Sequence, residues 1–273
     1  MDKIKIINEA LSIPRVSKRV KTLKISNDQL NDSIIILLDI IQEYNLKEEP
    51  KYITSFNLSK NGRLVPTRIL SENGKEKKFL NNLITQNITP INTSLRIKDI
   101  DQTKERIEVA LYLKEYKKDF DKKPKGFYLY GNMGIGKSYI SQAMANTLAA
   151  KGYSVAFLNI VDLVSTIKSK FSSGYETFIN KLKLVDHLFI DDIGAETIVS
   201  WFRDEVLLSI LSSRMNNNLS TFFTSNYSYE ELERYQSRTN GSKYPDKNKS
   251  SRLMERIKAL TVPISINGKN RRY

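Results

Sequence analysis

The segment GNMGIGKS, residues 131–138, limits what this chain can fold into more than any other feature. It follows the apolar run GFYLY and precedes YISQAMANTLAA, which has the composition of a helix. A glycine-rich loop between a strand and a helix lets backbone N–H groups surround phosphate oxygens, and the lysine and serine after it can reach phosphate and magnesium. The alternative is a glycine-rich turn that opens a helix by chance. We expect a phosphate-binding loop made of Gly131, Asn132, Met133, Gly134, Ile135, Gly136, Lys137, Ser138 and Tyr139.

Apolar segments alternate with helical ones from residue 126 to the end of the chain. Strand–helix alternation is typical of a parallel sheet covered on both faces. The pattern therefore predicts an α/β fold with a five-stranded parallel sheet sandwiched by helices over residues 126–273, without a separate helical lid. The five expected strands contain FYLY, SVAFL, HLFIDD, TFFTSN and TVPISI.

Residues 1–125 have a different pattern. DQTKERIEVALYLKEYKKDF, residues 101–120, predicts an amphipathic helix, and we expect residues 96–125 to be this helix and a linker. Residues 1–95 predict a small partner-binding module of helix with irregular or β structure. Within it, residues 26–46 predict one helix capped by Ser26 or Asn27, and NGRLVPTRIL predicts a short strand interrupted by Pro66.

Polar side chains at the ends of two expected strands suit nucleotide chemistry. Asp191 and Asp192 end HLFIDD, and a carboxylate there can hold magnesium while the next orients water. Asn226 ends TFFTSN, where it can contact a γ-phosphate or the attacking water. Such residues can also merely cap strands or form turns. Near the C-terminus, Arg252 and Arg256 are four residues apart on one helix face, either in solvent or directed at a neighbouring subunit's nucleotide.

Charge and composition narrow the class of partner. The 273 residues carry a formal net charge of +14, which suggests a polyanionic partner, although a lysine-rich, AT-biased genome would give the same excess. With no cysteine and one histidine, a zinc cluster is not expected. We see no secretory signal and no apolar run long enough to span a bilayer, so we expect a cytoplasmic protein without a membrane partner.

Together, GFYLYGNMGIGKSYISQAMA, HLFIDDIGAE, TFFTSNYS, SRLMERI and NGKNRRY resemble the AAA+ helicase loaders of the DnaI/DnaC family. IstB-type transposition ATPases share most of these motifs. The resemblance covers roughly residues 95–273 and implies ATP and Mg²⁺ as ligands. It implies Lys137 and Ser138 in the Walker A role and Asp191 and Asp192 in the Walker B role, with Ser138 and Asp191 near the metal. The remaining implied roles are sensor 1 for Asn226, an arginine finger for Arg256 or alternatively Arg252, and a sensor-2-like role for Arg271.

The resemblance also implies a place for single-stranded DNA. VDLVSTIKSKFSSGYETFINKLKLV, residues 161–185, occupies the position of a helical insertion that helps to line a DNA channel in relatives. The alternative is an ordinary amphipathic helix pair with solvated lysines. Two departures from the family pattern stand out. Without cysteine the zinc site of the N-terminal domain of DnaI-type loaders cannot exist, so either a metal-free module docks on the helicase or the partner contacts have diverged. Without a helical lid, closure of the nucleotide site would have to come from a neighbouring subunit or the helicase. Expected DNA contacts are Lys168, Lys170, Phe171 and Lys181, with Tyr175 as a second stacking residue.

Three functions follow from these motifs. The first is an ATP-dependent loader that assembles on a hexameric replicative helicase, self-associates through its ATP interface and delivers the ring onto single-stranded DNA. The second is a transposition ATPase that targets a transposase to DNA. The third is a nucleotide-binding scaffold without useful turnover, which Asp192 permits because a glutamate is more usual there.

Overall fold

The computed structural model describes residues 2–85, 87–101, 103–122, 124–169, 174–238 and 246–271, and it divides into two compact units, Met1–Phe79 and Leu80–Tyr273. The division falls earlier than the boundary expected after residue 95. The reason lies in contacts to the large sheet: Leu83 forms an isolated bridge with Val155, and the Thr85 hydroxyl donates a 2.7 Å hydrogen bond to the Phe157 carbonyl. Residues 80–95 therefore belong to the second unit.

The first unit is a helical cluster with a two-stranded antiparallel sheet. The segment expected as one helix over residues 26–46 is two helices, because the first ends at Asn31 and the second begins at Ile34. The second strand runs through Pro66, which a two-stranded sheet tolerates because each strand has an open side. The elements are α1 (Lys3–Ser12), α2 (Pro14–Leu23), α3 (Asn27–Asn31), α4 (Ile34–Tyr44), β1 (Tyr52–Leu58) and β2 (Leu64–Leu70), and α5 (Glu72–Asn82) extends from this unit into the next.

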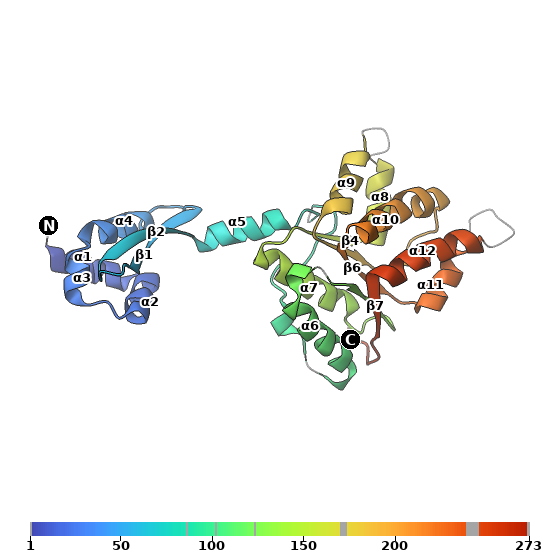
Figure 1. Ribbon diagram of the computed structural model, residues 1–273, viewed down its shortest axis with the longest axis horizontal. Helices are drawn as coiled ribbons and strands as arrows, with labels where there is room; N and C mark the ends of the chain where they lie inside the picture. Colours follow the sequence, from blue (N-terminus) through green and yellow to red (C-terminus); the bar gives the residue numbers. More distant parts are fainter. Residues whose placement is uncertain are drawn as a thin grey trace. The chain divides into compact units, whose positions relative to one another are not determined.

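Five parallel strands form the centre of the second unit, in the order β4-β5-β6-β3-β7 (Figure 1). This confirms the fold predicted from the alternating pattern. Because the strands are parallel and β3, β5 and β6 lie side by side, the loops that follow these three strands meet at one edge of the sheet. The strands are β3 (Gly126–Tyr130), β4 (Val155–Asn159), β5 (His187–Asp191), β6 (Ser220–Ser225) and β7 (Thr261–Ser265).

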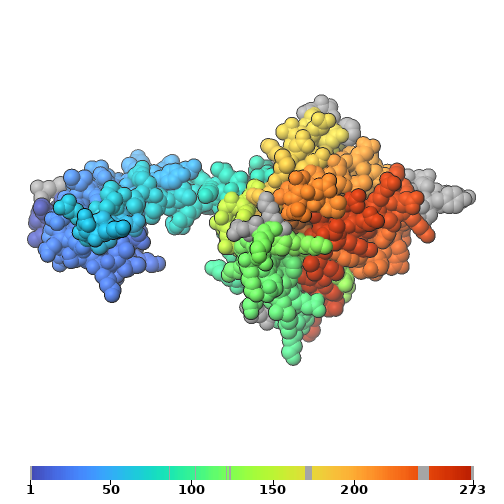
Figure 2. Space-filling model, in the orientation of Figure 1, coloured from blue at the N-terminus to red at the C-terminus, as the bar shows by residue number. Residues whose placement is uncertain are grey.

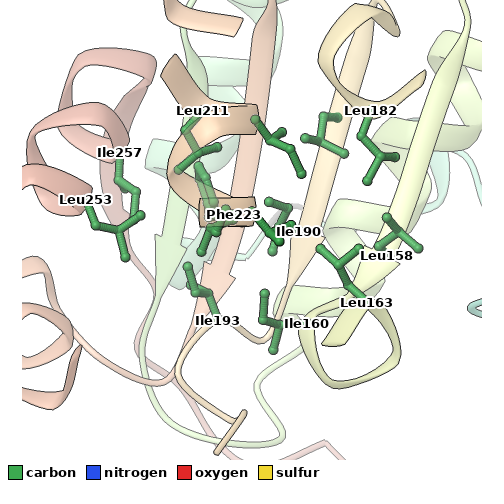
Figure 3. Close-up of a cluster of buried hydrophobic side chains, with 14 of the residues drawn as sticks. Leu158, Ile160, Leu163, Leu182, Ile190, Ile193, Leu211, Phe223, Leu253 and Ile257 are labelled. Carbon is green, nitrogen blue, oxygen red and sulfur yellow. The ribbon is translucent and has the colours of Figure 1, made fainter. Parts of the chain in front are cut away.

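Helices cover both faces of this sheet. On one face, side chains from α8, α9, α10 and α12 pack on Tyr128, Ile190 and Phe223, and Figure 3 shows part of this core. On the other face, Tyr116 of α6 lies edge-on to Phe222, with ring centroids 5.4 Å apart. The helices are α6 (Ile107–Lys118), α7 (Lys137–Lys151), α8 (Ile160–Ser169), α9 (Glu176–Leu184), a π-helical turn (Phe202–Leu207), α10 (Leu208–Asn216), α11 (Tyr229–Gln236) and α12 (Lys247–Leu260).

The helix before the sheet is shorter than expected. It begins at Ile107 instead of residue 101, after a 3-10 turn over Lys104–Arg106. Arg106 is buried there, and its Nη2 donates to the Ile135 carbonyl at 3.2 Å. The segment before α6 thus leaves the helical path to contact the glycine-rich loop.

Candidate nucleotide-binding site

The glycine-rich loop connects β3 to α7, and its conformation requires glycine. Gly134 and Gly136 have φ values of +78° and +98°, in the region that other residues rarely adopt. A Cβ at Gly134 would lie 2.1 Å from the Asn270 Oδ1, and one at Gly136 would lie 2.6 Å from the Arg106 Nη2. The loop therefore combines left-handed backbone with close packing from both sides, and α7 begins at Lys137 immediately after it.

Lys137 is held across the mouth of the loop. Its Nζ donates to the carbonyl oxygens of Gly131 and Asn132 at 2.7 and 2.8 Å, and to the Oδ1 of Asn226 at 2.8 Å. The Asn226 Nδ2 in turn donates to the Asp192 Oδ1 at 3.0 Å. The structure therefore brings together the loop lysine, the asparagine after β6 and a carboxylate after β5 in one hydrogen-bonded row.

The two carboxylates differ in environment. Asp191 is buried at the end of β5, which raises the pKa of its carboxyl group, while hydrogen bonds from Thr224 and Ser138 act in the opposite direction. Asp192 has a φ of +59° and lies at the cleft. Ser138 and Asp191, which were both expected near a metal, are thus close in space, and Asp192 lines the cleft together with Ser138.

Thr224 holds both aspartates, and the sequence pattern did not identify it. Its hydroxyl donates to the Asp191 Oδ1 at 2.6 Å and accepts from the Asp192 backbone N–H at 2.8 Å. The available signal was its spacing, because Thr224 precedes Asn226 by two residues and alternate strand residues share a face.

A cleft of about 570 Å³ lies over the loop. Two segments far apart in the sequence close one side of it: the Arg271 N–H donates to the Gly134 carbonyl at 2.9 Å, and its guanidinium pairs with Asp101. Arg106 is 3.9 Å from Asp101, and burial together with the nearby charge of Arg271 lowers its pKa. The lining residues are Asp101, Arg106, Met133, Gly134, Gly136, Lys137, Ser138, Tyr139, Asp192, Asn226 and Arg271.

The sequence pattern also did not identify Asp101 and Arg106 as residues of the cleft. In a segment with a helical pattern, charged residues usually mark a solvated face, and nothing in the residue pattern marked these two as different. Asn132, Ile135 and Gly131 take part in the loop through backbone carbonyls that accept hydrogen bonds from Lys137 or Arg106.

The remaining expected site residues lie elsewhere. Arg252 and Arg256 are on α12, outside the set of described residues that line the cleft; Arg252 is exposed, and the Arg256 Nη1 is 3.2 Å from the Glu255 carboxylate. Lys168 and Lys181 are exposed on α8 and α9, drawn in yellow in Figure 2 at the opposite end of this unit from the green α6. Lys170 and Phe171 lie outside the described residues, and Tyr175 is half-buried against the core.

The described residues contain neither a metal cluster nor a membrane span beside this site. No three or more His, Asp or Glu side chains gather among them as a group able to bind a metal ion. Within the same residues, every helix is too short or too polar to cross a membrane.

The sheet order, the loop after β3, the carboxylates after β5 and the asparagine after β6 define a P-loop nucleoside triphosphatase domain. The family model described as IstB-like ATP binding protein matches residues 86–272, so the chain belongs to this family of ATP-binding AAA+ proteins.

Relatives of known name are similar to this chain over the same region. The replicative helicase loader DnaI of Bacillus subtilis (strain 168) is 38% identical over 172 residues, which cover 62% of this chain and 55% of DnaI. The replicative helicase loader DnaC of Escherichia coli (strain K12) is 30% identical over 122 residues, covering 44% of this chain and 49% of DnaC. The chain thus aligns with about half the length of these relatives. A crystal structure of DnaI matches with a TM-score of 0.58 at 34% identity, covering 64% of this chain and 92% of that one.

Proposed function

We propose that this protein is an ATP-dependent loader that delivers a hexameric replicative helicase onto single-stranded DNA. The observation that carries the proposal is the row of hydrogen bonds from Lys137 through Asn226 to Asp192, at the mouth of the phosphate-binding loop. It occurs in a chain that is 38% identical to a replicative helicase loader over 172 residues.

The site residues fit ATP and Mg²⁺. The loop backbone and Lys137 would bind the phosphates, and Tyr139 and Arg271 line the same cleft. Ser138 and Asp191, which are close in space, would hold Mg²⁺, which neutralises phosphate charge when it is bound. Asp192 would orient the attacking water, because Asn226 fixes its carboxylate at the cleft. Through the same hydrogen bond, a change in the contact between Asn226 and the γ-phosphate would change the position of the Asp192 carboxylate.

Arg256 is our candidate for a finger that enters a neighbouring subunit's site. Its side chain is 30% exposed on α12, so a second subunit can reach the guanidinium. Arg252 lies on the same helix one turn away and is exposed. ATP would then join subunits, because only the assembled site contains the arginine.

Paired substitutions test this assignment. We expect Arg256→Ala to leave ATP affinity within about twofold of wild type and to lower helicase- or DNA-stimulated hydrolysis by about 100-fold or more. Arg252→Ala is the matched control, with near wild-type turnover. The reverse pattern would move the finger to Arg252, and normal turnover by both variants would remove the composite site from the proposal.

The first unit is proposed to bind the helicase. It has a hydrophobic core of its own, built around residues such as Ile6, Leu37 and Phe56, so it can present a surface independently of the ATPase unit. ATP hydrolysis would end the assembly and release the loader, which makes the nucleotide a timer. Exposed lysines on α8 and α9 would contact the DNA backbone.

The family model favours one alternative, a transposition ATPase that targets a transposase to DNA, because its description is IstB-like. The partner captured by the first unit distinguishes the two functions. A scaffold without turnover is a third, since Asp192 stands where glutamate is more usual. Steady-state hydrolysis with and without single-stranded DNA tests it: equal, low rates in wild type and Lys137→Ala would support the scaffold.

A further inference from the structure

Glu196 is a buried carboxylate close to the nucleotide site that the proposed chemistry does not use. Only 4% of the residue is exposed, and each of its carboxylate oxygens accepts a hydrogen bond. Its Oε2 accepts from the Gly194 backbone N–H at 2.7 Å, and its Oε1 accepts from the Gln236 Nε2 at 2.7 Å. Glu196 thus joins the loop that carries Asp192 to the last turn of α11.

The loop it holds has an unusual backbone. Asp192 and Gly194 have φ values of +59° and +97°. A Cβ at Gly194 would lie 2.7 Å from the Tyr227 ring, which stacks on Tyr235 with centroids 5.3 Å apart. Asp192 is a non-glycine residue in the left-handed region, a conformation that persists only where surrounding contacts hold it. Thr224 holds its backbone N–H, and the Glu196 hydrogen bond to Gly194 holds the loop two residues further on.

From Gln236 the contacts continue to α12. The Gln236 carbonyl accepts a 2.6 Å hydrogen bond from the Nη1 of the buried Arg203. Arg203 binds Asp204 at 2.6 Å and lies 3.6 Å from Asp246. Asp246 caps α12 by accepting from the Lys249 N–H at 3.2 Å.

This row ends on the helix that carries Arg252 and Arg256. Arg203 and Asp204 also belong to the π-helical turn Phe202–Leu207, a form that often occurs at functional sites. The buried polar chain therefore connects the Asp192 loop, α11, the π-helical turn and the first turn of α12.

We propose that Glu196 is a positioning residue that transmits the nucleotide state of the Asp192 loop to α12, and so to its arginines. The inference rests on the proposed ATPase function and adds to it a connection within one subunit. A buried carboxylate suits this role because it accepts two hydrogen bonds at once from groups on different elements.

Glu196→Gln tests the connection with little change in shape. The new amide can accept from Gly194 and donate its NH₂ to Gln236 once the Gln236 amide turns over, so a charge-assisted hydrogen bond is replaced by a neutral one of roughly half the strength. We expect the affinity for MANT-ATP, a fluorescent ATP analogue, to stay within about twofold of wild type and kcat to fall about tenfold. Trp201, the sole tryptophan, adjoins the π-helical turn, and its fluorescence change on adding Mg-ATP should fall by at least about half.

The double variant E196Q/Q236E supplies a rescue that a general loss of stability would not show. It restores an amide–carboxylate pair with the two groups exchanged, and an amide at position 196 can then accept from Gly194 while donating to position 236. We expect it to recover kcat to within about threefold of wild type, together with the Trp201 signal. Glu230→Gln, an exposed change on α11, should match wild type throughout.

Wild-type kcat and Trp201 signal in Glu196→Gln would overturn the inference, as would a double variant no better than Glu196→Gln. A wild-type protein that binds nucleotide without any Trp201 change would also overturn it. If the wild-type protein failed to bind nucleotide at all, the proposed function would fail first.

Discussion

At the scale of single residues, the nucleotide site depends on a few side chains that each hold another in place. Lys137 contacts Asn226, Asn226 contacts Asp192, and Thr224 contacts both aspartates. Each bond links the ends of different strands, so the site exists only when β3, β5 and β6 are correctly paired.

Removing the charge of Lys137 should abolish ATP binding. We expect Lys137→Ala to weaken affinity by about 100-fold or more, because a desolvated lysine–phosphate contact is among the strongest in such a site. Lys151→Ala, an exposed change at the other end of α7, is the control and should bind as wild type. Isothermal titration calorimetry measures both, and equal affinities in the two variants would contradict the assignment of Lys137.

Glu43 gives a pH-dependent prediction for the first unit. Burial raises the pKa of its carboxyl group, but hydrogen bonds from the Thr54 N–H and hydroxyl and from Arg68 outweigh this, so the pKa lies below its ordinary value of 4.5. An acid with a lowered pKa stabilises the folded state above its unfolded pKa and loses this contribution as pH falls through the folded pKa.

Glu43→Gln should therefore lower the thermal midpoint of the first unit at pH 7, and its difference from wild type should shrink as pH drops below about 4.5. Differential scanning calorimetry at a series of pH values measures this. Glu48→Gln, an exposed nearby change, is the control. A difference that stays constant down to about pH 3 would contradict the role of the Glu43 charge.

The roles of residues that form a spaced motif could be predicted from the sequence, whereas the contacts that hold these residues in place could not. Glycines, Lys137 and the two aspartates are visible because their chemistry requires those residues at those positions. Thr224, Arg106 and Glu196 act through hydrogen bonds to residues 29 to 40 positions away. A lone threonine, arginine or glutamate in the sequence indicates none of these partners.

At the scale of elements, the alternation of apolar and helical segments identified all five strands of the large sheet. Four of them, β3 to β6, are buried along nearly their whole length and are therefore continuously apolar, whereas β7 is partly exposed. Helix boundaries were less predictable. Residues 101–106 have a helical pattern, yet tertiary contacts to the phosphate-binding loop override it. The π-helical turn has no signature in the sequence that we recognised.

The helices α8 and α9 carry the proposed DNA contacts. We expect K168E/K181E to weaken binding of a single-stranded oligonucleotide and to reduce the slope of log K against log salt by about 0.7 for each phosphate that is no longer neutralised. Lys151→Glu is the control: it makes the same change of charge per substitution at an exposed site on α7. It should keep the wild-type slope. Fluorescence anisotropy over a salt series measures the slopes, and identical slopes would contradict DNA contact by this helix pair.

At the scale of the whole molecule, the chain combines two units with separate hydrophobic cores. The structure of the second unit could be predicted from the sequence much better than that of the first. The second unit contains motifs that can be recognised in the sequence, and the family model matches residues 86–272. The first unit was predicted only as a helix with irregular or β structure, because short amphipathic segments specify packing partners poorly. Its proposed role depends on a partner, so it can be tested only with that partner present.

The loader function is tested most directly by the mass of the product formed when the full-length protein is mixed with its own cell's hexameric replicative helicase. Size-exclusion chromatography with light scattering, in the presence of Mg-ATP, should give a complex heavier than the helicase alone. Lys137→Ala under the same conditions should give less of it, because assembly uses the ATP interface. A wild-type protein that elutes separately from the helicase under these conditions would contradict the loader function.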